Sequence, residues 1–192
     1  MAKNVYFITH PNVFISRDVP VPHWPLSERG LERMRQCLRQ PWVSEITAVY
    51  CSDEQKAIDG AKILADHLSL AFIELPELRE NDRSSTGFLP PKEFEEVAYE
   101  FFSKPEESVR GWESAADAQR RIIRAVEGLV ASDRSGGAIA IVSHGAVGTL
   151  LYCYLSGNEI NRRWDQPPNS GGNYFRFSLA PQTVIDWWKQ ID

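Results

Sequence analysis

Two histidines in this chain occupy positions from which an imidazole ring could do chemistry. His10 follows the short apolar run 5–9 and precedes a proline, whereas His144 follows the apolar run 138–143 and precedes a glycine. A proline biases the residue before it toward an extended backbone, which holds the His10 ring in one direction, as a nucleophile requires. Gly145 opens a helix, whose free N–H groups and dipole favour an anion such as phosphate. Either histidine alone could simply end a strand, so only the pair indicates a site.

Further polar residues follow another apolar run, 46–51. The segment Ser52-Asp53-Glu54-Gln55 is typical of a capping box that opens a helix, and Lys56 lies one helical turn beyond Ser52. These two residues would add hydrogen-bond donors and a cation to the same rim. An equally good interpretation makes Ser52 a plain helix cap and Lys56 a solvated charge.

The elements that must position these residues alternate along the chain. We expect strands at 5–9, 46–51, 71–75 and 138–143, and a closing antiparallel pair at 174–179 and 184–188. We expect helices from about Ser27, from Ser52 to Leu68, and at 92–103, 113–131 and 146–155. Strands separated by helices predict a three-layer α/β/α sandwich around a mostly parallel sheet, as a single domain spanning 1–192. Ligands bind such sheets outside the carboxyl ends of the strands, where His10, Ser52 and His144 lie.

Composition excludes several classes of partner. A net charge of −5 gives no electrostatic bias toward nucleic acid, and no run of about 18 apolar residues predicts a membrane span. The first apolar run is too short for a secretion signal, so we expect a cytoplasmic protein. Cys37, Cys51 and Cys153 are odd in number and widely spaced, which favours buried, reduced thiols.

Five segments, in order along nearly the whole chain, resemble motifs of the histidine phosphatase superfamily, which includes the phosphoglycerate mutase-like proteins. These segments are Thr9-His10-Pro11, Pro25-Leu26-Ser27-Glu28-Arg29-Gly30, Cys51-Ser52-Asp53-Glu54-Gln55-Lys56-Ala57, Leu78-Arg79-Glu80 and Val142-Ser143-His144-Gly145. The family counterparts are Arg-His-Gly, Pro-Leu-Ser/Thr-x-x-Gly, Ser-Ser-Asp-x-x-Arg-Ala, Leu-Arg-Glu and the second histidine motif. The resemblance implies a phosphoglycerate mutase-like fold.

The resemblance also implies a two-step reaction. His10 would attack phosphorus and form a phosphohistidine that water later hydrolyses, while His144 would stabilise the equatorial oxygens. Glu80 would protonate the leaving oxygen and then activate water, with Asp82 as the reserve candidate. A loop carboxylate paired with a neighbouring arginine is the plainer interpretation of Glu80.

Two positions depart from the family pattern. The family holds phosphate with two arginines, and here Thr9 and Lys56 stand in their places. Lysine keeps a charge without the bidentate fork, and threonine keeps only a hydroxyl. Arg17, Arg79 or Arg83, on loops that leave the same edge of the sheet, could restore positive charge. The expected phosphate-binding or substrate-binding residues are therefore Thr9, Ser52, Lys56, Arg79, Arg83 and Gly145.

The predicted function is hydrolysis of a small phosphomonoester. The alternative is a phosphatase-like domain that binds a phosphorylated ligand with weak turnover or none. A third interpretation makes Cys51 a nucleophile served by His144. We expect no cofactor, and no metal, because the chain lacks His-Glu-x-x-His and paired-cysteine spacings. A homodimer stays possible, with Trp187 and Trp188 assigned to a core or an interface.

Overall fold

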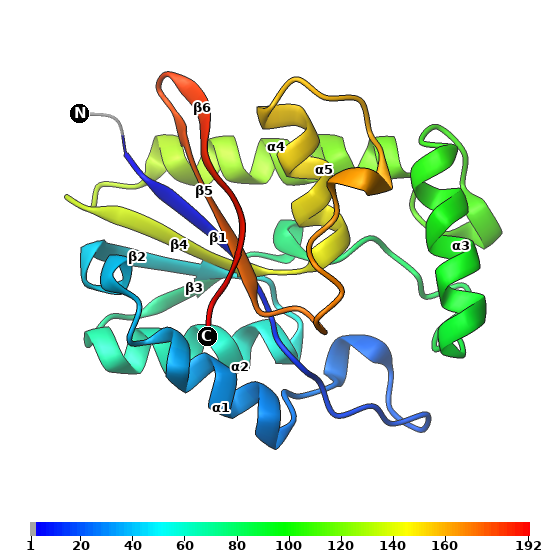
Figure 1. Cartoon of the computed structure of the whole chain (residues 1–192), viewed down its shortest axis with the longest axis horizontal. Coiled ribbons are helices and arrows are strands. Elements are labelled where there is room, and N and C mark those ends of the chain that lie inside the picture. The colour runs from blue at the N-terminus through cyan, green and yellow to red at the C-terminus, as the bar shows by residue number, and fades with distance from the viewer. Residues whose placement is uncertain (1–2) are drawn as a thin grey trace.

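One six-stranded mixed sheet forms the centre of the computed structural model, which describes residues 3–192 (Figure 1). Its strand order is β3-β2-β4-β1-β5-β6. The strands are β1 (Val5–Thr9), β2 (Ile46–Cys51), β3 (Phe72–Glu74), β4 (Ala138–Ser143), β5 (Asn173–Leu179) and β6 (Gln182–Gln190). The first four are parallel, and β5 and β6 add an antiparallel edge. This arrangement confirms the predicted α/β class and its mostly parallel sheet.

Helices cover both faces of the sheet and complete the predicted three layers. On one face lie α1 (Glu28–Cys37) and α2 (Gln55–Leu68), and on the other α4 (Ala115–Ser132) and α5 (Gly145–Leu155) (Figure 1). The remaining helix, α3 (Pro91–Ser103), stands to the side of the sheet. Because successive side chains of a strand point to opposite faces, Tyr6 and Ile8 pack toward α1 and α2, whereas Val5 and Phe7 pack toward α4 and α5.

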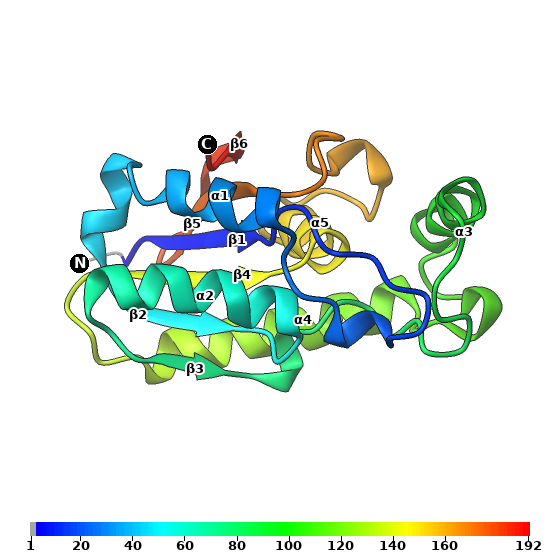
Figure 2. The same cartoon turned by 90° about the horizontal axis from the view of Figure 1, so that it is seen from below.

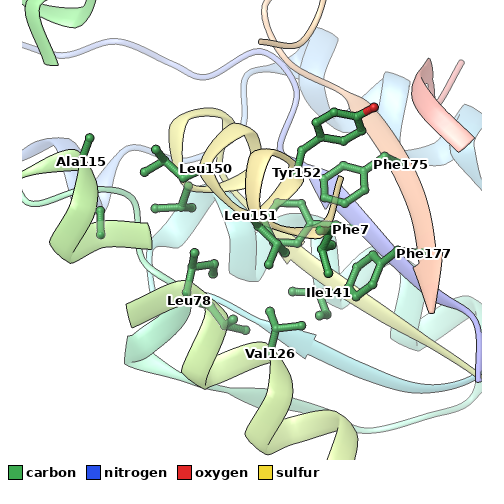
Figure 3. Packing of buried hydrophobic residues seen from close by; sticks show 14 of the residues in the cluster. Phe7, Leu78, Ala115, Val126, Ile141, Leu150, Leu151, Tyr152, Phe175 and Phe177 are labelled. Atoms are coloured by element: carbon green, nitrogen blue, oxygen red, sulfur yellow. The ribbon is translucent and has the colours of Figure 1, made fainter. Parts of the chain in front are cut away.

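The larger of the two cores lies between the sheet and the pair α4 and α5. Figure 3 shows strand residues such as Phe7, Ile141 and Phe175 packed against Val126 of α4 and Leu151 of α5. Every residue of β1 and β4 is buried, as expected for strands covered on both faces. None of the helices in residues 3–192 is long and apolar enough to cross a membrane.

The starts of the two helices on the other face differ in their capping. Ser27 caps α1 as predicted, with its hydroxyl accepting the Gly30 N–H at 3.2 Å. The predicted capping box at Ser52 is wrong, because α2 begins at Gln55 and its N-cap, Glu54, makes no side-chain capping bond. The Ser52 hydroxyl accepts the Glu54 N–H at 3.2 Å and lies against His144, so it is engaged outside the helix.

The sheet register brings three strand ends to one edge. Thr9 pairs with Ser143, and Cys51 pairs with Val142. The pairing continues one residue further, with His10 N–H donating to Ser143 O and Ser52 N–H to Val142 O, each at 3.0 Å. Figure 2 shows the loop after β1 running beyond the sheet on the side where α3 lies.

Candidate active site

His10 is held with one ring nitrogen free to react. Its Nδ1 lies 2.9 Å from the Pro11 carbonyl oxygen. A carbonyl can only accept a hydrogen bond, so Nδ1 carries the proton and Nε2 keeps its lone pair. Burial, aided by the nearby charge of Lys56, lowers the pKa of His10 to about 4. The ring is therefore a neutral nitrogen nucleophile near neutral pH.

Two glycines hold the backbone of His10 from the other side. Gly172 N–H donates to the His10 carbonyl at 3.2 Å. Gly171 has φ of +75°, and a Cβ on it would lie 2.2 Å from the same oxygen, so only glycine fits this approach. The segment before β5 is thereby fixed against the end of β1.

His144 lies directly against His10. The two ring centroids are 5.2 Å apart and the ring planes meet at 69°. His144 is fully buried, its Nε2 lies 2.8 Å from Ser52 Oγ, and its Nδ1 has no partner within residues 3–192. Burial holds the pKa of His144 well below its ordinary value, although Glu54 opposes this effect. Because the rings touch edge to face, an anion that contacts both would bind beside the pair rather than between them.

Glu54 and Lys56 form a buried ion pair behind the two histidines. Lys56 Nζ lies 2.5 Å from Glu54 Oε2 and 2.9 Å from the Val21 carbonyl oxygen. Glu54 Oε1 lies 3.5 Å from His144 Nε2 and accepts the Glu80 N–H at 3.0 Å. Burial alone would raise the pKa of Glu54, but His144 and Lys56 outweigh it and keep the carboxylate ionised. The predicted cation, Lys56, thus lies at the site with its charge already neutralised by Glu54.

The Glu80 carboxylate occupies the first turn of α5. Its oxygens accept the N–H groups of Ala146 at 3.2 Å and Val147 at 3.0 Å. The carboxyl group at these two donors is therefore the protein's own, which corrects the expectation that phosphate would bind at the helix opened by Gly145. Burial raises the pKa of Glu80, although the charge of Arg83 opposes the rise.

The reserve acid, Asp82, differs from Glu80 in its exposure, its hydrogen-bond partners and the direction of its pKa shift. Asp82 is exposed, and its Oδ1 accepts the Ser84 N–H at 2.8 Å. Hydrogen bonds from Ser84 lower the pKa of Asp82. A group that gives a proton to a leaving oxygen near neutral pH needs a raised pKa, so the geometry favours Glu80.

Of the three candidate arginines, Arg83 is the one whose charge acts at the histidines. Its guanidinium carbon lies 5.1 Å from the ring centroid of Phe94 and 5.7 Å from that of Trp112, and it forms no ion pair within residues 3–192. Burial is the main cause that lowers the pKa values of both histidines, and the positive charge of Arg83 is a smaller cause that acts in the same direction. Arg79 is paired with Asp53 and more than half exposed, and Arg17 is exposed over Phe88.

Thr9 is fully buried in a small polar network instead of at an open pocket. Its hydroxyl donates to Gln166 Oε1 at 2.7 Å, and the Asn173 side-chain amide donates to the same oxygen at 2.8 Å. The Asn173 backbone N–H in turn donates to Thr9 Oγ1 at 3.0 Å. Sequence reasoning missed Gln166, because nothing in a loop sequence indicates that one amide will meet the end of β1.

The remaining sequence hypothesis, a cysteine nucleophile, finds no support. Burial, with Glu74 next, raises the pKa of Cys51 to about 12, and His144 contacts Ser52 instead of the thiol. All three cysteines are unpaired and buried. Within residues 3–192, no three His, Cys, Asp or Glu side chains are arranged to hold a metal ion.

Comparison with solved structures defines the class of fold. A mycobacterial glucosyl-3-phosphoglycerate phosphatase in complex with inorganic phosphate superimposes with a TM-score of 0.80 at 18% identity, over 99% of each chain. The Bacillus stearothermophilus protein YhfR gives 0.75 at 20% identity, over 95% of this chain and 94% of that one. The alpha-ribazole phosphatase from Shigella flexneri gives 0.66 at 18% identity, over 94% and 93%. The fold is therefore phosphoglycerate mutase-like.

The family follows from the sequence. The model of the histidine phosphatase superfamily (branch 1) matches residues 15–182, a span that includes Ser52, Glu80 and His144 and begins just after His10. This chain belongs to the histidine phosphatase superfamily. No curated protein matches it in sequence.

Proposed function

We propose that the protein is a phosphatase that hydrolyses a small phosphomonoester through a phosphohistidine on His10. The observation that carries the proposal is the state of the His10 ring. Its Nδ1 is tied to the Pro11 carbonyl, its pKa lies near 4, and His144 contacts it. A half-buried neutral imidazole with Nε2 unprotonated is a nucleophile that needs no further base.

In the first step, the His10 Nε2 lone pair attacks phosphorus and the ester P–O bond breaks. Glu80, whose pKa burial raises, gives its proton to the leaving oxygen, so an alcohol departs. In the second step, water attacks the phosphohistidine, Glu80 takes a proton from that water, and the N–P bond breaks. Phosphate leaves and both residues return to their starting states.

Arg83 supplies the positive charge in this proposal. The family's arginine positions hold Thr9, which is bound to Gln166, and Lys56, which is bound to Glu54. Arg83 is the half-buried arginine whose charge reaches both histidines and Glu80. His144 is the second donor, because a proton on its unpartnered Nδ1 could bind a phosphoryl oxygen.

The substrate class we propose is a small organic phosphate in the cytoplasm, with no cofactor, nucleic acid or membrane as partner. One similar structure is named as a glucosyl-3-phosphoglycerate phosphatase and another as an alpha-ribazole phosphatase, and these names support this class. Phe88, half-buried on the loop beyond η3 (Pro76–Leu78) and packed 5.8 Å from the buried Trp24 ring, offers apolar surface for the organic part. Three buried thiols suit a reducing compartment.

A second candidate is a binding domain without efficient turnover. The observation that favours it is the engagement of Thr9 and Lys56 within the protein, since neither offers a free donor to phosphate. Loss of one transition-state donor costs on the order of 10²- to 10³-fold in rate. Binding of phosphate with no hydrolysis would identify this candidate.

The test is a panel of aryl and sugar phosphomonoesters assayed for released phosphate. The proposal expects hydrolysis of at least one compound, abolished in His10→Ala and reduced in His144→Ala, with both variants folded by circular dichroism. Full activity in His10→Ala contradicts the phosphohistidine route. Binding of inorganic phosphate by calorimetry, with no hydrolysis of any compound, supports the second candidate instead.

A further inference from the structure

We propose, on the basis of the phosphatase function above, that Gln166 binds the transferring phosphoryl group in place of the family arginine missing at Thr9. The family motif carries a guanidinium on the residue before its first histidine. In this chain that residue is a short threonine, and the side chain that meets it is Gln166. We infer that the amide N–H₂ of Gln166 is the donor that a longer side chain at Thr9 would have supplied.

The orientation of the Gln166 amide is fixed at its oxygen. Thr9 Oγ1 and Asn173 Nδ2 both donate to Gln166 Oε1, at 2.7 and 2.8 Å. Two donors on the oxygen leave the nitrogen at the opposite end of a planar amide, so Nε2 must point away from Thr9. The two hydrogen bonds to Oε1 therefore fix the direction of the two Nε2 N–H bonds. Both N–H groups stay available to an external acceptor.

The place of the nitrogen is given by Gly145. A Cβ on Gly145 would lie 2.4 Å from Gln166 Nε2, so the amide nitrogen lies against the first residue of α5. The amide thus connects the residue before His10 with the residue after His144. Gln166 is half-buried, and its Nε2 donates to no group within residues 3–192. A free, oriented donor between Thr9 and Gly145, the chain neighbours of the two histidines, is placed to bind an oxygen of a phosphoryl group held there.

The chemical consequence is a neutral donor in place of a cation. A neutral hydrogen bond is weaker than a charge-assisted one, so we expect a smaller contribution than an arginine would make. The donor is nevertheless preorganised, because Thr9 and Asn173 hold it before substrate arrives. Preorganised donors act mainly on the transition state, so the loss should appear in kcat more than in KM.

The alternative is a purely structural glutamine that ties the segment before β5 to β1. Two variants separate the roles: Gln166→Glu still accepts from Thr9 and Asn173 but has no N–H to give, and Gln166→Met is neutral and has no N–H. A structural role predicts that Gln166→Met lowers the free energy of unfolding and keeps wild-type kcat in the folded protein. The donor role predicts a loss in Gln166→Glu that exceeds the loss in the neutral variant Gln166→Met, since the carboxylate also repels the phosphoryl oxygens.

The experiment measures kcat and KM on the best monoester of the panel, together with inhibition by orthovanadate, which resembles the five-coordinate transition state. We expect Gln166→Met to lower kcat by up to on the order of 10²-fold with KM little changed. Vanadate inhibition should weaken more than inhibition by inorganic phosphate. Wild-type kcat and vanadate affinity in both variants would overturn the proposal.

A double-mutant cycle tests the link to Thr9. Thr9→Val removes the hydroxyl that orients the amide and should also lower kcat. Adding Thr9→Val to Gln166→Met should cost nothing further, because both changes remove the same donor. Independent, additive losses would contradict the link. Gln119→Met is the matched control: this half-buried glutamine donates to Leu150 O on the α4 side, and its loss should leave kcat unchanged.

Calorimetry distinguishes failure of the phosphatase proposal from failure of the Gln166 proposal. If the wild-type protein hydrolyses nothing but binds inorganic phosphate, the Gln166 proposal is read from calorimetry, where Gln166→Glu should weaken binding and unchanged affinity would contradict it. If the wild-type protein neither hydrolyses monoesters nor binds phosphate or vanadate, both proposals are wrong.

Discussion

A buried charge is stable only if it is paired, and the Glu54–Lys56 pair is the clearest case in this protein. Both side chains are almost fully buried, and each also holds part of the site: Glu54 contacts His144, and Lys56 binds the Val21 carbonyl. Removing one partner of such a pair leaves an isolated charge in a low dielectric.

We therefore predict that Lys56→Met lowers the free energy of unfolding by about 3 to 5 kcal/mol. Adding Glu54→Gln should recover much of that loss, because no unpaired carboxylate remains. The matched control is Lys62→Met, which breaks an exposed pair with Asp66 and should cost about 0 to 1 kcal/mol. Urea denaturation measures all three variants, and equal losses for Lys56→Met and Lys62→Met would show that burial of the pair is unimportant.

The two arginines of one loop give a second contrast at the scale of the residue. Arg83 stacks on Phe94 and Trp112, and its charge acts on the histidines, whereas Arg79 pairs with Asp53 at the surface. We predict that Arg83→Met lowers kcat/KM for the best monoester on the order of 10²- to 10³-fold. Arg79→Met should have a much smaller effect. The reverse order in steady-state kinetics would reassign the phosphate-binding role to Arg79.

Helix α5 shows what an element contributes beyond its individual residues. Its first turn holds the Glu80 carboxylate, its preceding residue is His144, and its first residue lies under Gln166. The direct connection of β4 to α5 thus brings the carboxyl group of Glu80, the imidazole of His144 and the amide of Gln166 close together.

Gly145→Ala tests this arrangement, because its Cβ would meet Gln166 Nε2 at 2.4 Å and displace the amide. Alanine is a better helix former than glycine by up to about 1 kcal/mol, so stability should change little. We predict a folded protein with lowered kcat. The double variant Gly145→Ala/Gln166→Met should have the same kcat as Gln166→Met alone, because the amide is already absent. Wild-type kcat in Gly145→Ala would show that the contact over α5 has no role.

The helices and strands are the part of this molecule that the sequence predicts best. Apolar runs such as 138–143 must be buried on both faces, which fixes strands, parallel order and the edge where His10 and His144 meet. Helix starts were less predictable: Ser27 caps α1, but Ser52 turns its hydroxyl to His144 and leaves α2 to begin at Gln55. A local capping pattern cannot reveal that a distant side chain competes for the same oxygen.

Glu54 and Gln166 show the limit of sequence reasoning at the site. The sequence indicates Glu54 only as part of a capping box, and Gln166 lies in a loop with no motif of its own. Each acquires its contacts from elements far away in sequence, His144 for one and Thr9 for the other. Three-dimensional packing alone supplies that information.

At the scale of the whole molecule, two neutral histidines, the half-buried His10 and the buried His144, couple folding to pH. The pKa values of His10 and His144 are lowered in the folded state, to about 4 for His10, whereas histidines of an unfolded chain titrate near 6.5. Below pH 6.5 the unfolded chain therefore binds protons that the folded protein does not. Stability contributed by these histidines is full above pH 6.5 and is lost as the pH falls toward 4.

We predict that the free energy of unfolding falls between pH 6.5 and pH 5 by up to about 1.4 kcal/mol per pH unit for each of these histidines. The variant His10→Asn should reduce that slope, whatever its stability at pH 7. Urea denaturation at a series of pH values above 5 measures the slope in the wild type and the variant. Glu80, whose pKa is raised in the folded state, contributes with the opposite sign to both proteins, so the difference between the two slopes reports on His10. An identical slope in His10→Asn would contradict a neutral His10 with a lowered pKa.

The central claim is that His10 Nε2 carries the phosphoryl group between substrate and water. Rapid quenching of a ³²P-labelled monoester with denaturing base preserves phosphohistidine, and peptide mapping locates the label. The account predicts label on the peptide that contains His10 and none in His10→Ala. Hydrolysis that proceeds with no labelled protein, or with label that persists in His10→Ala, would contradict it.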